Sequence, residues 1–350
     1  MRSLVSGDFH AGDYNTGPIV NGVCDRLNDL AWQVRQMRDY AVRHQVKWLI
    51  LCGDFFRNRR PSNLHLSMLA EFLYGFRSCG IQVLCITGNH DVYLVEGQAH
   101  ALSVFKHVHL PGVNIYDEPA LETIEGIKFL FFPYTGAPQD ARLREAIAKF
   151  PGADVLVMHG SVEGSVVAHQ CEFEIHDADE VKFETVAPFK LVLSGHLHNG
   201  HNTANVWYPG SIERLTFDDE GVEKGFLDVT IEGGQAQVTK VPLEARTLLT
   251  LTYDQFPEVI AGALDVKGKV VRVVDVDDQH VASVQRILKE KGCYHVAGVY
   301  RQRPESRPVE RVDSRKLDTG EFVRQYAKGV DYKGDVEAAV RTVAEMLEAK

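Results

Sequence analysis

Five short apolar runs in this chain each end in a cluster of Asp, His or Asn residues, and this arrangement constrains the fold more than any other feature. The runs cover residues 4–7, 48–53, 83–88, 155–158 and 191–195. Ligands of an open α/β sheet bind beyond the carboxyl ends of its strands, so polar residues in these positions can meet at one edge. Glycine directly precedes the first polar residue in four of the five clusters, as a sharp turn or a close backbone approach requires.

The wider pattern predicts an α/β fold. Continuous apolar strands that alternate with helical stretches indicate a sheet covered on both faces. We expect strands at residues 4–6, 46–52, 81–86, 127–132, 155–158 and 191–194, and helices at about 20–44, 63–79, 96–107 and 139–149. Later strands are expected at 206–208, 225–231 and 235–241, the last two joined by a hairpin turn at Gly233-Gly234.

After Pro242 the pattern restarts and predicts a second, smaller domain. Strands at 248–253, 269–274 and 295–300, with a helix at about 278–291, suit an α+β unit. We therefore expect a large domain over 1–245, an α+β capping domain over 246–303, and a linker with C-terminal helices over 304–350. The last helix carries an apolar stripe that can pack on its own domain or dock on a partner protein.

The five clusters together offer ligands for two divalent cations. Their oxygen and nitrogen donors, with no thiolate, suit Mn²⁺, Fe²⁺ or Zn²⁺ better than Cu(I) or an iron–sulfur cluster. Seven side chains exceed the needs of one ion but suffice for two that share a carboxylate. Coordination can lower the pKa of a water to about 7, which makes hydroxide available at neutral pH. The candidate ligands are Asp8, His10, Asp54, Asn89, His159, His196 and His198.

In order, the clusters read Asp-x-His, Gly-Asp, Gly-Asn-His-Asp, His-Gly and Gly-His-x-His, a series that resembles the calcineurin-like metallophosphoesterases. The resemblance implies a four-layer α/β/β/α sandwich with Asp54 bridging two metals. One metal would also bind Asp8, His10 and His198, and the other Asn89, His159 and His196. His90 would act on the phosphate, by protonating the leaving oxygen or stabilising the transition state, and Asp91 would orient it.

Two further segments resemble the SbcD-type DNA repair nucleases. Residues 53–62, Gly-Asp-Phe-Phe-Arg-Asn-Arg-Arg-Pro-Ser, are similar to their second motif, and the Gly-Asp-x-Val-Asp-Arg-Gly of the family's protein phosphatases is absent. Residues 208–215, followed by an acidic turn and Lys224-Gly225-Phe226, resemble the end of an SbcD nuclease domain. This resemblance implies a manganese-dependent 3′→5′ exonuclease on double-stranded DNA and endonuclease on single strands. It also implies a homodimer that works with an SbcC-like coiled-coil ATPase.

The net charge of −10 gives the chain no general attraction for nucleic acid. A polyanionic substrate must therefore be held by bound metals or by local basic groups. Arg57, Arg59 and Arg60 follow Asp54 closely and can hold DNA phosphates, although a solvated loop would show the same pattern. Arg57 also departs from the resemblance, since many relatives carry an acidic or neutral residue there. A weaker basic run lies in residues 301–316.

The sequence leaves two other functions open. A phosphoesterase for small molecules such as nucleotides or cyclic nucleotides would use the same metal ligands. A non-catalytic scaffold for DNA ends would keep the fold without the chemistry. The apolar stripe of Leu69, Phe72, Leu73 and Phe76 is equally compatible with core packing and with homodimer formation.

The sequence also predicts the cellular location of the protein and the redox state of its cysteines. No run reaches the ~20 apolar residues that cross a membrane, and the first motif leaves no room for a signal peptide. The six cysteines lack C-x-x-C spacing and are expected to be buried free thiols. We therefore expect a cytosolic protein without membrane contact.

Overall fold

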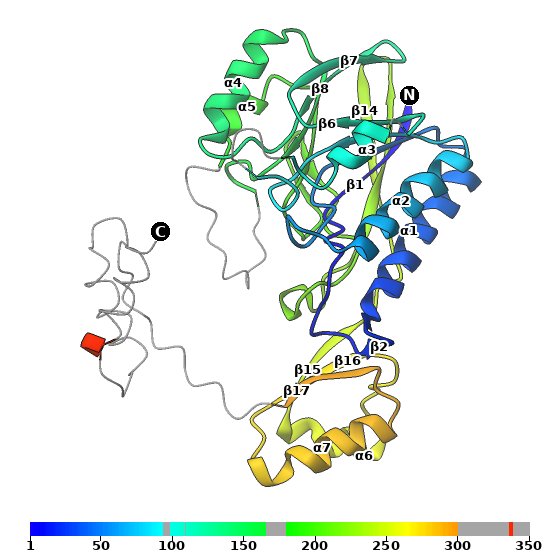
Figure 1. Cartoon of the computed structure of the whole chain (residues 1–350), viewed down its shortest axis with the longest axis vertical. Coiled ribbons are helices and arrows are strands. Elements are labelled where there is room, and N and C mark those ends of the chain that lie inside the picture. Colours follow the sequence, from blue (N-terminus) through cyan, green and yellow to red (C-terminus); the bar gives the residue numbers. More distant parts are fainter. Residues whose placement is uncertain (94–98, 109, 166–179, 300–335, 339–350) are drawn as a thin grey trace.

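Two six-stranded sheets pack against each other in the computed structural model, which describes residues 1–93, 99–108, 110–165, 180–299 and 336–338 (Figure 1). The first sheet has the strand order β14 (Gln235–Pro242), β13 (Gly225–Glu232), β1 (Arg2–Ser6), β4 (Trp48–Leu51), β5 (Gln82–Ile86) and β6 (Val113–Tyr116). The second has the order β11 (His201–Thr203), β12 (Val206–Tyr208), β10 (Leu191–Gly195), β9 (Val155–His159), β8 (Ile127–Phe132) and β7 (Ala120–Ile124).

Helices cover the outer face of each sheet. Helices α1 (Arg26–Arg43) and α2 (Asn63–Ser78) pack on the first sheet, with α3 (Ser103–Val108) near β6. Helices α4 (Gln139–Lys149) and α5 (Phe183–Val186) lie on the second sheet (Figure 1). The layer order helix, sheet, sheet, helix confirms the predicted α/β/β/α sandwich.

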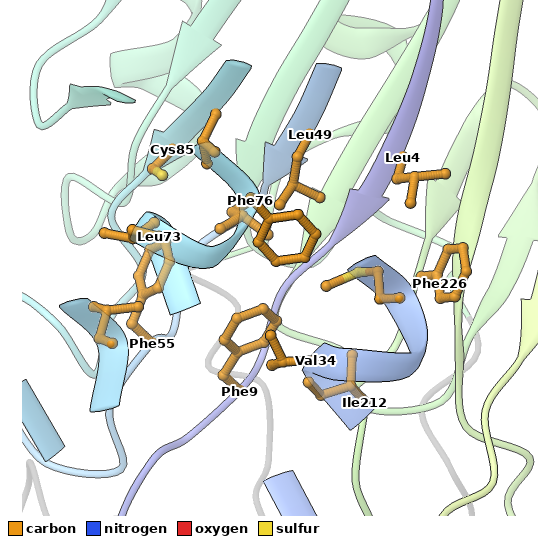
Figure 2. Packing of buried hydrophobic residues seen from close by; sticks show 14 of the residues in the cluster. Leu4, Phe9, Val34, Leu49, Phe55, Leu73, Phe76, Cys85, Ile212 and Phe226 are labelled. Carbon is orange, nitrogen blue, oxygen red and sulfur yellow. The ribbon is translucent and has the colours of Figure 1, made fainter. Parts of the chain in front are cut away.

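Burial on both faces explains why the strands are continuously apolar. Successive side chains of a strand point to opposite faces of the sheet. Leu4 and Leu49 therefore contact the helical layer, whereas their neighbours Val5 and Ile50 fill the space between the two sheets. Figure 2 shows the helical side, where Phe76 of α2 packs near Leu49. Fully burying one such side chain contributes roughly 1.5–3 kcal/mol.

Parallel pairing brings the strand ends together at one edge. Strand β4 pairs in parallel with β1 (Val5↔Ile50) and with β5 (Ile50↔Leu84). In the second sheet β9 and β10 are also parallel. The segments that follow these strands consequently leave their sheets in the same direction, and this is where the five polar clusters lie.

One predicted helix begins later than expected. The stretch expected to be helical from residue 20 contains a hairpin of β2 (Ile19–Val20) and β3 (Val23–Cys24) before α1 begins at Arg26. Asn21 and Gly22 form its turn with φ values of 52° and 79°. Two consecutive positive φ values are what a two-residue hairpin turn needs, and Asn-Gly is the strongest sequence signal for it. Strands β6, β7 and β11 and helix α5 were also not predicted.

Residues 248–299 form a smaller α/β unit with a core of its own, at one end of the molecule (Figure 1). Its parallel sheet has the order β15 (Leu248–Thr252), β16 (Val270–Val274) and β17 (His295–Val299). Helix α7 (Asp278–Glu290) and the unpredicted α6 (Phe256–Ala261) contribute apolar residues to that core. The proposed linker and C-terminal helices fall outside the described residues, apart from a helical turn at 336–338.

Three further predictions concern the apolar stripe of α2, the cysteines and membrane-spanning helices. Leu69, Leu73 and Phe76 are buried in the chain's own core with Phe72 packed against it, so core packing already uses this stripe. The five described cysteines are free thiols, but they are not all buried as expected: Cys293 is half-buried, and Cys79 is exposed because it follows the last turn of α2. Within the described residues, no helix combines the length and apolar character needed to cross a bilayer.

Candidate metal centre

The loops after β1 and β4 are joined by backbone hydrogen bonds that place three candidate ligands together. The amide of Asp8 donates to the carbonyl oxygen of Gly53 at 2.9 Å, and that of His10 donates to the carbonyl oxygen of Asp54 at 3.0 Å. A third bond follows from Ala11 to Phe55 at 2.8 Å. The two loops therefore extend the parallel pairing beyond the sheet and hold Asp8, His10 and Asp54 side by side.

Four of the candidate ligands themselves adopt left-handed backbone conformations. The φ values are 51° at Asp8, 44° at His10, 56° at Asp54 and 93° at His196. Such conformations cost non-glycine residues about 1–3 kcal/mol each and persist where the surrounding structure enforces them. The sequence predicted a sharp turn or a close backbone approach at the glycines that precede the clusters. Of these described glycines, Gly53 alone has a positive φ, of 92°.

Two other glycines are needed for space. A Cβ atom on Gly88 would lie 2.2 Å from Oδ1 of Asp54, and one on Gly195 would lie 2.3 Å from the carbonyl oxygen of Cys52. Both distances are far below van der Waals contact, so any side chain would displace the loops that carry the ligands.

Asp8, His10 and His198 form the first ligand set, with donor atoms within 4.8 Å of one another. The Nε2 atoms of His10 and His198 are 3.0 Å apart. This spacing is short enough for both imidazole nitrogens to bind one cation at about 2.1 Å. Oδ2 of Asp54 lies 3.5 Å from Nε2 of His10 and can complete this set.

Asn89, His159 and His196 form the second set. Oδ1 of Asn89 is 2.9 Å from Nε2 of His159 and 3.2 Å from Nδ1 of His196. Oδ2 of Asp54 also lies 3.4 Å from Nε2 of His159. The same carboxylate oxygen thus faces both sets, which is the position that a bridging ligand requires.

Hydrogen bonds outside the two sets fix the orientation of His159. Its Nδ1 donates to the carbonyl oxygen of Cys52 at 2.6 Å, and the buried amide of Gln139 donates to its backbone oxygen at 2.9 Å. With Nδ1 held in this way, Nε2 is the ring nitrogen that faces the site. Such outer contacts set the tautomer of metal-binding histidines.

The electrostatics of the cluster favour bound cations. Burial raises the pKa of Asp8 to about 7 and lowers that of His196 to about 3. Burial by itself also raises the pKa of Asp54, but His159 and His10 bring it well below its usual range. For His159 burial lowers the pKa, and the Asp54 carboxylate more than offsets this and raises it to about 9. His196 is therefore a neutral donor, whereas the Asp54 carboxylate stabilises positive charge beside it, as the raised pKa of His159 shows.

The donor set fits two divalent cations. It combines two buried carboxylates, an amide oxygen and four imidazoles, and a cation beside Asp8 would favour its ionised form. Residues 1–200 match the sequence profile of a family described as calcineurin-like phosphoesterase. This match spans more than half of the chain.

The chain belongs to the calcineurin-like phosphoesterase family. Similar solved structures include the protein TT1561 of Thermus thermophilus, with 12% identity over 68% of this chain and 98% of that chain and a TM-score of 0.41. A dimetal phosphatase from Danio rerio is 10% identical over 69% and 95% of the two chains, with a TM-score of 0.41. A cold-active protein-tyrosine phosphatase of a psychrophilic Shewanella is 12% identical over 69% and 80%, with a TM-score of 0.31.

In this calcineurin-like phosphoesterase, His90 lies beside the ligand sets. Its Nδ1 is 2.8 Å from the carbonyl oxygen of Arg57, and its ring centroid is 4.8 Å from that of His10. Its backbone amide donates to Oδ1 of Asp54 at 2.9 Å. The ring also approaches His10 and Asp54 closely enough to form a third candidate cluster, so a catalytic and not a ligand role for His90 remains a prediction.

Asp91 does not make the contact that the sequence suggested. Its carboxylate accepts hydrogen bonds from the backbone amides of Asp54, Phe55, Phe56 and Gly88, at 2.8 to 3.2 Å. Burial of this carboxylate favours such partners, because each amide offsets part of the cost of desolvation. The described contacts therefore assign Asp91 to the loops around Asp54. The Arg57 carbonyl oxygen, and not Asp91, contacts the His90 ring.

The three arginines after Asp54 have different surroundings. The Arg57 guanidinium donates to the carbonyl oxygen of Asp13 and lies 4.3 Å from the ring centroid of Tyr14. Nε of Arg59 donates to the backbone oxygen of Asn89 at 3.3 Å. Residues 57–60, with Asn89, His90 and Tyr93, line a pocket of about 410 Å³. The arginines that the sequence suggested for phosphate binding thus adjoin His90 and the candidate ligand Asn89.

Two supporting residues of this phosphoesterase were not assigned to the site from the sequence. The buried side chain of Gln139 fixes His159, and the buried Lys224 contacts the backbone of His198. Both come from elements distant in sequence, so spacing gives no signal for them. For Lys224 the sequence offers a different signal, because this lysine directly precedes the buried strand β13.

Proposed function

We propose that this metal-dependent phosphoesterase hydrolyses DNA as a 3′→5′ exonuclease on double strands and an endonuclease on single strands, with Mn²⁺ as its metal. The observation that supports DNA is the arginine-bearing pocket beside His90 and Asn89. A phosphomonoester needs only the metal centre, whereas a polynucleotide presents further phosphates on either side of the bond to be cut. Basic groups beside the centre can hold these phosphates.

Bound divalent cations would polarise the phosphoryl oxygens and supply a nucleophile by lowering the pKa of a water to about 7. The chain's own residues then divide the remaining work. Asp54 joins the two ligand sets, because its Oδ2 atom faces both of them. The Arg57 carbonyl oxygen accepts the Nδ1 proton of His90, so His90 acts as an acid only as an imidazolium, which donates its second proton, from Nε2, to the leaving oxygen.

The remaining assignments rest on the resemblance to SbcD-type nucleases. They are a cytosolic homodimer, a capping domain over residues 246–303, and an SbcC-like coiled-coil ATPase that docks on the C-terminal helices of 304–350. An equally open alternative is a phosphoesterase for nucleotides or cyclic nucleotides, because the ligand sets serve any phosphoester. A non-catalytic scaffold for DNA ends is the alternative without chemistry.

One experiment separates these functions. The purified chain is incubated with Mn²⁺ and three substrates: end-labelled duplex DNA, a circular single strand, and a panel of cyclic nucleotides and nucleoside monophosphates. Release of nucleotides from the duplex and nicking of the circle support the nuclease. Turnover of the small substrates alone would overturn it in favour of the small-molecule enzyme. Binding of duplex ends without Mn²⁺-dependent hydrolysis of any substrate would favour the scaffold.

A further inference from the structure

We propose that the pocket lined by Arg59, Arg60 and Tyr93 binds the nucleotide next to the scissile phosphate. The two guanidinium groups hold the phosphate of that nucleotide, and the Tyr93 ring stacks on its base. This inference rests on the proposed function and deepens it, because it defines the minimal substrate as a phosphodiester with a base and a second phosphate on one side.

The charge of the pocket suits an anion. Within the described part of the chain, its lining includes three arginines and no carboxylate, although the net charge of the whole chain is −10. Other arginines form ion pairs, such as Arg2 with Asp228 at 2.6 Å and Arg246 with Asp29 at 2.6 Å. Among the described residues, Arg59 and Arg60 have no carboxylate partner within salt-bridge distance. Their guanidinium groups therefore remain available for a phosphate, which they can bind with two parallel hydrogen bonds.

The position of the pocket suits an adjoining nucleotide. Nε of Arg59 is tied to the backbone oxygen of Asn89, which is itself a candidate metal ligand. His90 forms part of the pocket wall. A phosphodiester placed on the metal centre would thus continue directly into the pocket, without crossing another element.

Tyr93 gives the pocket its aromatic surface. Its hydroxyl oxygen accepts a hydrogen bond from Nε of Arg60 at 2.9 Å, and the guanidinium carbon lies 5.9 Å from the ring centroid. Arg60 therefore stands at the hydroxyl end of the ring and fixes its orientation. A tyrosine ring that is held in this way can stack on any base, which suits a nuclease without sequence preference. The volume of about 410 Å³ lies within the range of sites for molecules of nucleotide size.

Binding without metal is the first test. The probe is a 5′-phosphorylated dinucleotide with 2-aminopurine, whose fluorescence is quenched on stacking, titrated into the full chain in EDTA. We expect saturable quenching, a loss of affinity of about tenfold in Arg60→Gln, and loss of the quenching in Tyr93→Ala. Arg286→Gln, on the exposed face of α7, and Tyr74→Ala, on the exposed face of α2, serve as matched controls. Equal quenching in Tyr93→Ala and the native protein would overturn the base assignment.

Cleavage of a defined oligonucleotide is the second test. An abasic site at the position that adjoins the cut bond should lower kcat/KM of the native enzyme about tenfold, and it should have little further effect in Tyr93→Ala. If the abasic site lowers kcat/KM by the same factor in both proteins, the stacking partner is not Tyr93 and the inference fails.

The two proposals can fail separately. If bis(p-nitrophenyl) phosphate is hydrolysed and no oligonucleotide is cut, the nuclease function is wrong. If oligonucleotides are cut and Arg60→Gln and Tyr93→Ala match the two controls, the nuclease function stands and the nucleotide pocket is wrong.

Discussion

The side-chain ammonium of Lys224 lies 3.1 Å from the backbone oxygen of His198, so a buried cation supports the loop that carries a candidate metal ligand. The same ammonium is 2.8 Å from Oγ of Ser211 and 2.5 Å from Oδ1 of Asp219. The carboxylate of Asp219 in turn accepts the backbone amide of Leu215 at 2.9 Å. Lys224 therefore joins the ligand loop to the segment between β12 and β13.

Replacing Lys224 with methionine should destabilise the protein and weaken its metal site. The substitution leaves the Asp219 carboxylate buried without its partner, at a cost of about 3–5 kcal/mol in the free energy of unfolding. We expect Mn²⁺ affinity to fall about 10- to 100-fold, as for other residues that orient metal ligands. Adding Asp219→Asn should restore part of the stability, measured by urea unfolding, but not the affinity, measured by calorimetry. A folded double variant with native Mn²⁺ affinity would show that Lys224 is structural only.

His90→Asn should retain both metals and lose most of the hydrolysis. The side chain contacts the Arg57 carbonyl oxygen and is predicted to act as an acid, not as a ligand. Loss of a general acid typically lowers the rate about 10²- to 10⁴-fold. The test compares kcat on bis(p-nitrophenyl) phosphate with metal content from elemental analysis. Loss of a metal together with the activity would instead assign His90 to the third cluster, with His10 and Asp54.

Asp54→Ala should remove both metals at once. Its Oδ2 atom lies 3.5 Å from Nε2 of His10 and 3.4 Å from Nε2 of His159, so each ligand set loses the same oxygen. Asp39→Ala, at an exposed position on α1, is the matched control and should bind two metals. Elemental analysis after dialysis against Mn²⁺ checks the result. Retention of one metal per chain would mean that Asp54 serves one set only.

Asp228→Asn should reduce the stability in a manner that depends on pH. Burial by itself raises the pKa of Asp228, but the guanidinium of Arg2 and the hydroxyl of Tyr40 bring it below its usual range. A lowered pKa means that the unfolded chain binds the proton more tightly than the folded one. The stabilisation is thus complete above about pH 4 and is lost as the pH falls further.

We expect Asp228→Asn to lower the free energy of unfolding by about 1–2 kcal/mol at pH 7, because it removes a charged hydrogen-bond acceptor. Urea unfolding of both proteins at pH 7, 5, 4 and 3 measures the difference. The difference should shrink below about pH 4, where the native carboxylate also becomes protonated. A difference that is constant over this range would refute the assigned pKa.

Arg246→Gln should loosen the smaller α/β unit from the large one. The Arg246 guanidinium donates to both oxygens of Asp29 at 2.6 and 2.7 Å and lies 3.6 Å from the ring centroid of Tyr294. Glutamine removes the charge and cannot span these partners. Hydrogen exchange should accelerate at Asp29 and Tyr294 while the core of α7 stays protected. Unchanged exchange at both residues would show that other contacts suffice to hold the two units together.

The sequence by itself determined the order of the main strands and helices and the residues that can bind metal. Asp8, Asp54 and His159 each follow an apolar run, and parallel pairing of such runs allows little choice about where they meet. The hairpin turn at Asn21-Gly22 was also encoded locally, because these two residues readily adopt the positive φ values that the turn needs. The apolar pattern of the helix that follows extends over this turn and conceals its signal.

Only the tertiary structure decided which atoms support the ligands. Asp91 contacts the loops around Asp54, the Arg57 backbone orients His90, and Lys224 supports His198. Two of these contacts involve a backbone oxygen and the third involves backbone amides, and every residue except proline possesses both groups. Residue type therefore cannot reveal such partners in advance. Periodicity and motif order reflect the burial and spacing of side chains, whereas these hydrogen bonds depend on how distant loops pack.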